Sequence, residues 1–294
     1  MKFFSFRQTP TQNLAFLAFA CGINAVVSLI AAFLPLSSLF LMFVVPLTSA
    51  FVAYYCKPVY CPIYIIASAA ICLGASAWDI ASAIFYAIPG LFIGYLYGIL
   101  LKYRCTSSLN LFLCSILQLG FFYLSLLLIQ LILGIDMENA LLSLIGLGEK
   151  EGAAIGFPLF AYGFSLAEMA LTHLFIHLQI ERFGVNESKS IPFLAPLSAI
   201  GFAGIAIALA YFYAPISFLA MGASFYWGIL SIIELVGKRK NISFLVLGLL
   251  EVAGFLLFAA LYRSAGNGGL ALTSFLSLGA GMAQATNLLL LLRK

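Results

Sequence analysis

Ten long apolar stretches, each of roughly the 20 residues that a membrane-spanning helix needs, constrain the fold of this chain more than any other feature. Polar turns separate the stretches, and the alternation of apolar and polar residues expected of a transmembrane β-barrel is absent. The sequence therefore predicts an all-α fold, a polytopic transmembrane helical bundle of about ten spans. The predicted spans are residues 13–34, 37–55, 60–76, 82–101, 109–134, 155–179, 194–213, 216–236, 242–262 and 270–292.

The composition excludes a water-soluble fold. Apolar residues make up 64% of the chain and charged residues only 8%, whereas about a quarter of the residues are charged in soluble domains. The mean hydropathy is +1.13. A soluble domain could not bury so large an apolar fraction, so we expect most of the helices to face lipid or one another.

The basic residues give the orientation. Cytoplasmic loops of membrane proteins carry an excess of Lys and Arg, and of the 14 in this chain only Lys150 and Arg263 fall on the opposite side of the ten-span topology. We therefore expect a multi-pass protein of the cell membrane with cytoplasmic N and C termini. The division between spans seven and eight, near Ala214 and Pro215, is the one that no charge marks.

The sequence lacks the motifs of common enzymes and nucleotide-binding proteins, namely a Walker A loop, HExxH, GxSxG and a dinucleotide fingerprint. Its six cysteines form no CxxC pair and are interpreted as packing residues. The net charge of +4 follows from the cytoplasmic loops, so we expect no nucleic-acid partner, and membrane lipid is the expected partner of the basic run 238–240. We predict neither an enzyme nor a cofactor, although a membrane hydrolase with a site spread across helices remains an alternative.

The longest cytoplasmic interruption, residues 181–190, divides the chain into modules. We expect a six-span module at 1–183 and a four-span module at 191–294. The longest outer segment, 136–152, is apolar in its middle and either lies in the membrane interface or folds back as a lid.

Two rows of small residues predict close helix contacts, because helices associate in lipid through close backbone approach. One row is a GxxxGxxxG ridge, and the other lies on one face of the first span. Each row either packs inside the protein or docks a partner. The residues are Gly90, Gly94 and Gly98 in the ridge, and Ala15, Ala18, Gly22 and Ala25 in the first span.

Glu168 and Glu251 lie near the centres of their predicted spans, with no basic residue within a turn. An ionisable group at that depth costs about 2.5–3.5 kcal/mol on insertion scales, so it normally faces a cavity or a partner. Each carboxyl either binds a solute amine or a proton, or only fastens helices together. Asn24 likewise either joins helices or lines a binding pocket, and Trp78 with Asp79 either anchors an outer turn or caps such a pocket.

His173, His177 and Glu181 form an i, i+4, i+8 row at the end of span six. Imidazoles at this spacing can share a divalent metal ion, but the same row is typical of an amphipathic helix leaving the membrane. The pattern does not place a third ligand beside the two histidines, so we predict no metal.

The segment NLAFLAFACGINAVVSLIAAFLPLSSLFLMFVVPLTSAFVAYYCKP, with its Ala-rich first helix and internal Pro46, resembles the substrate-binding S components of energy-coupling-factor transporters. The run HLQIERFG followed by IPFLAPLS is similar to the YybS-like family of polytopic membrane proteins, and the resemblance covers nearly the whole chain. It implies a small-solute-binding subunit without its own ATPase. It also implies that Ala15, Ala18, Gly22 and Ala25 dock a coupling membrane subunit that works with ATPases, although Phe19 stands where a strict AxxxA would place alanine.

Two hypotheses from different classes follow. In the first, the chain binds a small solute among spans one to six, and Glu168 orients it. In the second, the chain is a membrane scaffold or an envelope or signalling interaction protein, whose buried acids only stabilise the helices.

Overall fold

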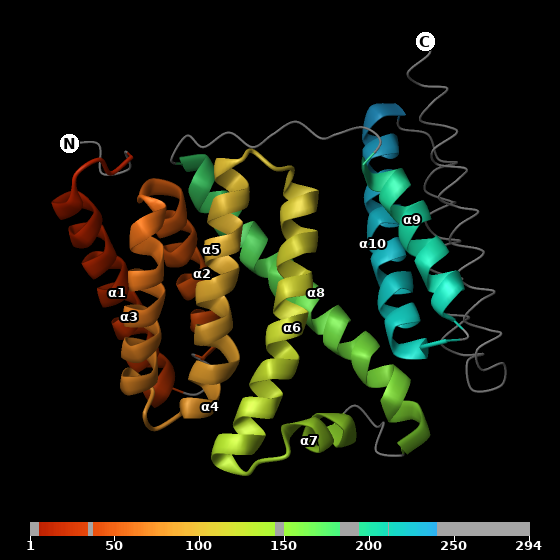
Figure 1. Cartoon of the computed structure of the whole chain (residues 1–294), viewed down its shortest axis with the longest axis horizontal. Helices are drawn as coiled ribbons and strands as arrows, with labels where there is room; N and C mark the ends of the chain where they lie inside the picture. The colour runs from red at the N-terminus through yellow and green to blue at the C-terminus, as the bar shows by residue number, and fades with distance from the viewer. Residues whose placement is uncertain (1–5, 35–37, 145–149, 183–193, 211, 240–294) are drawn as a thin grey trace. The chain divides into compact units, whose positions relative to one another are not determined.

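The structure is a computed structural model, and it describes residues 6–34, 38–144, 150–182, 194–210 and 212–239. These residues form helices and turns without a strand, which confirms the all-α prediction for this part of the chain. The predicted spans at 242–262 and 270–292 lie outside it. Figure 1 shows the helices, whose bounds are α1 (Pro10–Phe33), α2 (Ser38–Tyr55), η1 (Pro58–Tyr60), α3 (Cys61–Ala75), α4 (Ile80–Ser82), η2 (Ala83–Ala87), α5 (Ile88–Lys102), α6 (Ser107–Leu133), α7 (Met137–Leu144), α8 (Lys150–Arg182), α9 (Leu194–Leu209) and α10 (Ala214–Arg239).

Within the described residues, four helical segments are long and apolar enough to cross a membrane. Helices α4, η2 and α5 run on without a break and count as one of these segments. Shorter apolar helices cover Phe40–Tyr55, Leu194–Leu209 and Ile216–Ser231. The four long segments are Pro10–Phe33, Pro58–Ala75, Ile80–Lys102 and Ser107–Leu133.

Local sequence signals explain where the helices begin and end. Thr9 caps α1 in a capping box with Gln12, and Pro10 occupies the first turn, where its missing N–H costs nothing. Thr106 accepts a hydrogen bond from the backbone N–H of Leu109 at the start of α6. Gly134 ends α6 with φ of 69°, a left-handed conformation that favours glycine.

The chain divides into two compact units, Met1–Ile145 with Gly163–Lys189, and Gly146–Tyr162 with Ser190–Lys294. Helix α8 contributes to both units, with its residues up to Tyr162 in the second unit and those from Gly163 in the first. The predicted modules at 1–183 and 191–294 stay predictions.

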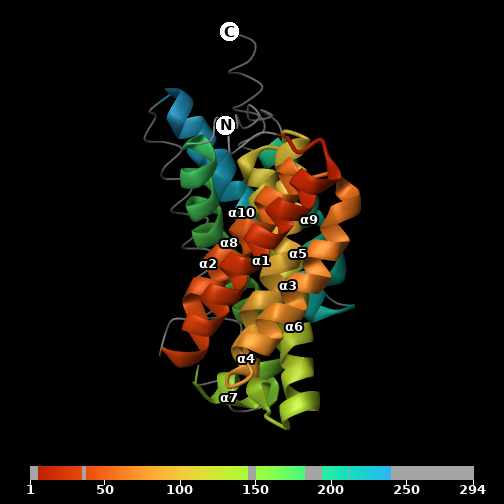
Figure 2. The same cartoon turned by 90° about the vertical axis from the view of Figure 1, so that its left-hand side faces the viewer.

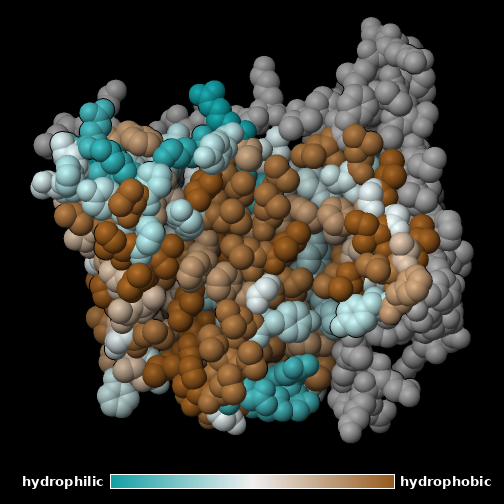
Figure 3. Space-filling view, in the orientation of Figure 1, coloured by the Kyte–Doolittle hydropathy of each residue, from teal (hydrophilic) through white to brown (hydrophobic). Residues whose placement is uncertain are grey.

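In the first unit, α1 packs on α2 and α3, and α5 packs on α2 and α6. The start of α1 and the short helix α7 lie at opposite ends of this unit (Figures 1 and 2). Figure 3 shows that apolar side chains cover most of the visible face of the unit, while hydrophilic ones gather at the end where α1 begins and over α7. An apolar middle with polar ends is the surface that a bilayer requires.

The tightest helix contact in the first unit joins α5 to α2 through the glycine ridge. Gly94 and Gly98 lie so close to the backbone of α2 that a Cβ at either position would overlap it, and a Cβ at Gly90 would lie 3.0 Å from Cδ of Pro46. The ridge is therefore buried inside the protein rather than presented on an outer surface.

A buried hydrogen-bond network joins α1, α2 and α3. The Asn24 amide donates to the Tyr64 hydroxyl (2.9 Å) and to Ser68 Oγ (3.2 Å), and Asn24 Oδ1 accepts from Thr48 Oγ1 (2.8 Å). Cys21 Sγ lies 3.2 Å from the same Ser68 Oγ. Because buried polar groups cost free energy unless they are paired, this network fixes the register of the three helices.

In the second unit, α9 packs on α10 through a stripe of alanines that includes Ala199, Ala203 and Ala206, all fully buried. Hydroxyls of α10 donate to carbonyls of α9, Ser217 Oγ to Ala206 O (2.6 Å) and Ser224 Oγ to Ala199 O (2.8 Å). Helix α9 ends at Leu209 and α10 begins at Ala214, so the division that no charge marks falls between two separate helices.

Candidate functional site

The part of α8 that belongs to the first unit buries three polar side chains on one face. Ser165 is 0% exposed, Glu168 5% and Thr172 1%. Their spacing of three and four residues places them on adjacent turns of the same side of the helix. A polar strip in an apolar helix needs partners on the neighbouring helices, and these partners define the candidate site.

Glu168 pairs with α6. Nε2 of Gln118 donates a hydrogen bond of 2.5 Å to Oε2 of Glu168, and both side chains are buried. Within the described residues no basic side chain forms an ion pair with Glu168. The sequence of α6 contains no Lys or Arg, and between Lys150 and Arg182 at its ends α8 contains none either. The carboxyl is therefore held by a neutral amide, an arrangement that leaves its charge available to a cation or a proton.

The helical segment facing this pair is continuous but irregular. Residues Ala83–Ala87 form a π-turn, in which the N–H of Ile88 bonds to the carbonyl of Ala83, and Pro89 follows directly. The carbonyl of Ile84 would meet residue 89 in the π register, but proline has no N–H, and Ser125 Oγ of α6 donates to this carbonyl instead (3.0 Å). Single π-turns inside α-helices are frequent at functional sites.

The π-turn brings Tyr86 to the site. Its phenol is close enough to interact electrostatically with Glu168, and also with Asp79. Asp79 caps the short helix α4, where its Oδ1 accepts from the backbone N–H of Ser82 (3.2 Å). Tyr86 therefore lies near two carboxyl groups, that of Glu168 and that of Asp79 in the turn that connects α3 with α4.

A helix with an internal proline contacts the same strip of α8. Pro46 in α2 cannot donate to the carbonyl of Met42, four residues earlier, and Thr172 Oγ1 donates to that carbonyl (3.2 Å). Neighbouring hydroxyls commonly satisfy such carbonyls in membrane helices.

Two polar atoms beside Glu168 lack a hydrogen-bond partner, although both are buried. They are Oε1 of Gln118 and Oγ of Ser165. Buried polar atoms are normally satisfied, and an exception calls for a water, ion or ligand, or for strain. The amide oxygen and the carboxyl of Glu168 can accept hydrogen bonds, and the Ser165 hydroxyl can both accept and donate one, so a ligand that donates could be bound here.

Aromatic rings adjoin this set. Phe85 contacts Phe122 (centroids 5.4 Å apart) and Phe164 (6.4 Å), and Phe122 contacts Phe164 (5.7 Å). Two of the three rings neighbour a polar member of the site along the chain, because Phe164 precedes Ser165 and Phe85 precedes Tyr86. An apolar group attached to a donating cation would find suitable contacts here.

The two histidines of α8 are located further along the helix. The hydroxyl of Tyr97 forms a hydrogen bond with Nδ1 of His173 (2.7 Å), and the rings of His173 and His177 stack with centroids 5.8 Å apart. The side chain of Glu181 lies outside the described part. In that part no three His, Cys, Asp or Glu side chains are arranged to hold a metal ion.

The other predicted residues fall at separate places. Trp78 is 83% exposed in the turn between α3 and α4. Asn24 is engaged in the network of α1, α2 and α3, and Gly90, Gly94 and Gly98 lie in the contact of α5 with α2. The row on α1 faces outward, since Ala15, Ala18 and Gly22 are exposed and Ala25 is partly so. Glu251 lies outside the described residues.

Sequence reasoning missed the roles of Tyr86, Ser165 and Thr172. A proline within an apolar helix leaves one backbone carbonyl without its usual N–H donor, and the prolines at 46 and 89 are visible in the sequence. Their presence indicates that another group must donate to this carbonyl, but the sequence does not show which helix supplies the hydroxyl.

Comparison with known proteins adds no relative. No family model, no curated protein and no solved structure matches this chain.

Proposed function

We propose that the chain is a polytopic protein of the cell membrane, with about ten spans and cytoplasmic termini. The four long apolar helices and the apolar middle of the first unit support this proposal. The backbone N–H of Arg7 bonds to the carbonyl of Tyr55, and Nζ of Lys102 lies 4.7 Å from the ring centroid of Phe6. Basic residues of three helix ends therefore gather on one side, as the positive-inside rule expects.

We further propose that the first unit binds a small solute and works as an S-component-like, transport-associated subunit without its own ATPase. The observation that carries this proposal is the buried carboxyl of Glu168, which has a neutral partner in Gln118, while Oε1 of Gln118 and the hydroxyl of Ser165 have no hydrogen-bond partner. All three groups can accept hydrogen bonds from the solute, and a protonated amine, with three donors, is the best match. Glu168 would supply the opposite charge.

The exposed row of Ala15, Ala18, Gly22 and Ala25 is where a coupling membrane subunit with its ATPases would dock. An outward row of small residues allows a second helix to approach closely. The same row supports the alternative function, in which the chain is a membrane scaffold and the partner is an envelope or signalling protein. Under the alternative, Glu168 and Gln118 only join α8 to α6.

Glu168→Gln separates the two functions. The protein is purified in mild detergent from its own membranes, and retained small molecules and proteins are identified by mass spectrometry. A solute-binding subunit should lose its retained solute in Glu168→Gln while the elution profile stays unchanged. Glu138→Gln, the same substitution at an exposed position of α7, is the matched control and should retain the solute.

Each outcome of this experiment favours one of the two functions. A solute that is retained equally by wild type and by Glu168→Gln would remove Glu168 from the site. Recovery of a coupling subunit and ATPases would support the transport role, whereas a different envelope partner and no retained solute would favour the scaffold.

A further inference from the structure

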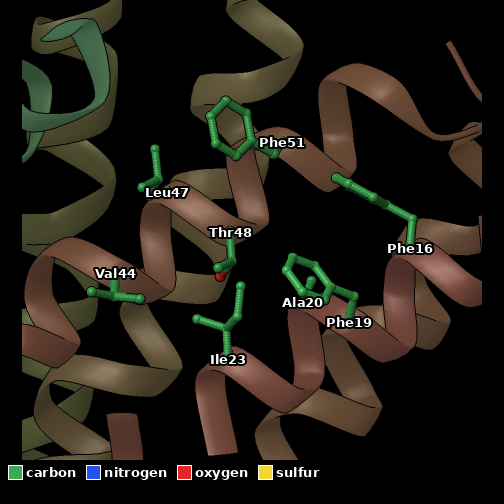
Figure 4. Close-up of a pocket in the computed structure, with 8 residues that line it drawn as sticks. All are labelled: Phe16, Phe19, Ala20, Ile23, Val44, Leu47, Thr48 and Phe51. Carbon is green, nitrogen blue, oxygen red and sulfur yellow. The ribbon is translucent and has the colours of Figure 1, made fainter. Parts of the chain in front are cut away.

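A groove of about 170 Å³ lies between α1 and α2, on helices other than those that hold Glu168 and Gln118. Its walls are almost entirely apolar, and Thr48 is the one polar residue among those that line it. Figure 4 shows the side chains of Phe16, Phe19 and Phe51 around the opening. Apolar cavities of about 150 Å³ stay dry and take up apolar guests, so hydrocarbon rather than water should fill this groove.

The groove runs along the helices. On α1 its lining extends from Phe16 to Ile23, and the seven residue steps between them span about 10 Å of helix axis. Phe16 is close to the start of α1, and Phe51 is close to the end of α2. One end of the groove therefore lies near the polar margin of the unit, and the other lies deeper.

A cation is located at the shallow end. The guanidinium carbon of Arg7 is 4.8 Å from the ring centroid of Phe16, which lines the groove. The backbone of Arg7 is held by the carbonyl of Tyr55 (2.9 Å), and Lys102 reaches Phe6, the neighbour of Arg7 in the chain. The sequence from Met1 to Trp78 contains no acidic residue, so no carboxylate from α1, α2 or α3 offsets these cations.

We propose that this groove is a binding site for an anionic phospholipid, with one acyl chain between α1 and α2 and the phosphate against Arg7. The two parts of the site match the two parts of the ligand. An acyl chain fits an apolar groove that follows the helix axis, and a guanidinium is well suited to phosphate because its N–H groups can donate in pairs. Basic residues at the cytoplasmic surface attract anionic lipid.

The lipid site and the predicted docking row use different faces of α1. At 100° per residue, the mean direction of Phe16, Phe19, Ala20 and Ile23 is roughly 130° from that of the row that begins at Ala15, and Phe19 is the groove residue nearest to the row. Phe19, which interrupts a strict AxxxA pattern, is a wall of the groove and is 53% exposed. The lipid proposal therefore does not depend on the docking row or on a solute at Glu168.

The test is native mass spectrometry of the delipidated full-length protein titrated with palmitoyl-oleoyl phosphatidylglycerol or with the phosphatidylcholine of the same chains. We expect the wild type to prefer the anionic lipid, and Arg7→Gln to weaken its binding about fivefold while leaving phosphatidylcholine unchanged. Arg104→Gln, which removes the same charge from an exposed turn, should behave as wild type. Phe19→Ala should weaken both lipids, because it removes a groove wall.

Leu14→Ala is the control for Phe19→Ala, since Leu14 is equally exposed, at 50%, on the same helix but does not line the groove. The proposal is overturned if the two lipids bind equally to the wild type or if Arg7→Gln has no more effect than Arg104→Gln. It is also overturned if Phe19→Ala binds lipid as well as Leu14→Ala does. Phe19 is exposed and Arg7 is partly exposed, so unchanged elution in gel filtration is expected for every variant.

Discussion

Substitution of the ridge glycines by alanine should separate the effect of helix contact from that of helix propensity. A Cβ at Gly94 would lie 2.7 Å from Cα of Pro46 and from Cβ of Ser49, and closer still to the carbonyl oxygen of Pro46. Two of these three atoms belong to the backbone of α2, so no side-chain rotation can relieve the overlap. At Gly120 of α6, by contrast, a Cβ would meet nothing within 4 Å.

The magnitude follows from these distances. Helices α2 and α5 would have to move apart by something on the order of an ångström to restore ordinary contact, and overpacking usually costs about 1–3 kcal/mol. Gly94→Ala belongs at the upper end of that range, because the clash involves backbone. Replacement of glycine by alanine also favours the helical conformation and stabilises the protein by about 1 kcal/mol. Gly120→Ala should show this stabilisation alone. Gly98→Ala should resemble Gly94→Ala, and Gly90→Ala should be milder because its nearest atom, 3.0 Å away, is in the Pro46 ring.

The assay is the apparent melting temperature of the purified protein in one detergent. A net loss of about 2 kcal/mol corresponds to a decrease of roughly 3 °C for a chain of 294 residues, while Gly120→Ala should melt at or above the wild-type temperature. The reasoning fails if Gly94→Ala melts within a degree or so of Gly120→Ala. Displacement of α2 should also disturb the hydrogen bond between Thr172 and the Met42 carbonyl.

Two further predictions concern other parts of the first unit. Thr172→Val should destabilise the protein by about 1–3 kcal/mol, because it leaves the Met42 carbonyl unsatisfied. The loss should be smaller in a Pro46→Ala background, because residue 46 then has an N–H that can bond to this carbonyl. Equal losses in both backgrounds, measured by thermal unfolding, would contradict this. Burial raises the pKa of the Cys56 thiol to about 12, so its folded-state thiol stays protonated at neutral pH and should resist a maleimide until the protein is denatured. Cys105 is partly exposed and should react in the folded state, from the cytoplasmic side only; mass spectrometry of labelled peptides checks both statements, and rapid labelling of folded Cys56 would refute the first.

Much of the helical pattern was predictable. The predicted spans 13–34, 37–55 and 109–134 lie within three residues of α1, α2 and α6, because apolar length and end signals such as Thr106 and Gly134 act locally. The interruption at Ala83–Ala87 was not predicted. A π-turn depends on a neighbouring helix that can satisfy the displaced carbonyl, here through Ser125.

The candidate site was likewise predictable only in part. The sequence singled out Glu168 correctly as a buried carboxyl at mid-helix, since an acid in an apolar run is visible without a structure. It did not show that Gln118 is the partner, 50 residues away, or that Asn24 is fully engaged with Thr48 and Tyr64. It also left open whether the glycine ridge faces inward.

The sequence by itself determined the helical class, the positions of the helices and the presence of costly polar groups, because these follow from hydropathy and local chain chemistry. Only the tertiary structure decided which polar groups meet and which small residues lie inside. In an apolar environment many helix pairings bury similar surface, so hydrogen bonds and close backbone contacts select among them. Glu168 with Gln118, Thr172 with the Met42 carbonyl, and Gly94 against Pro46 are such contacts.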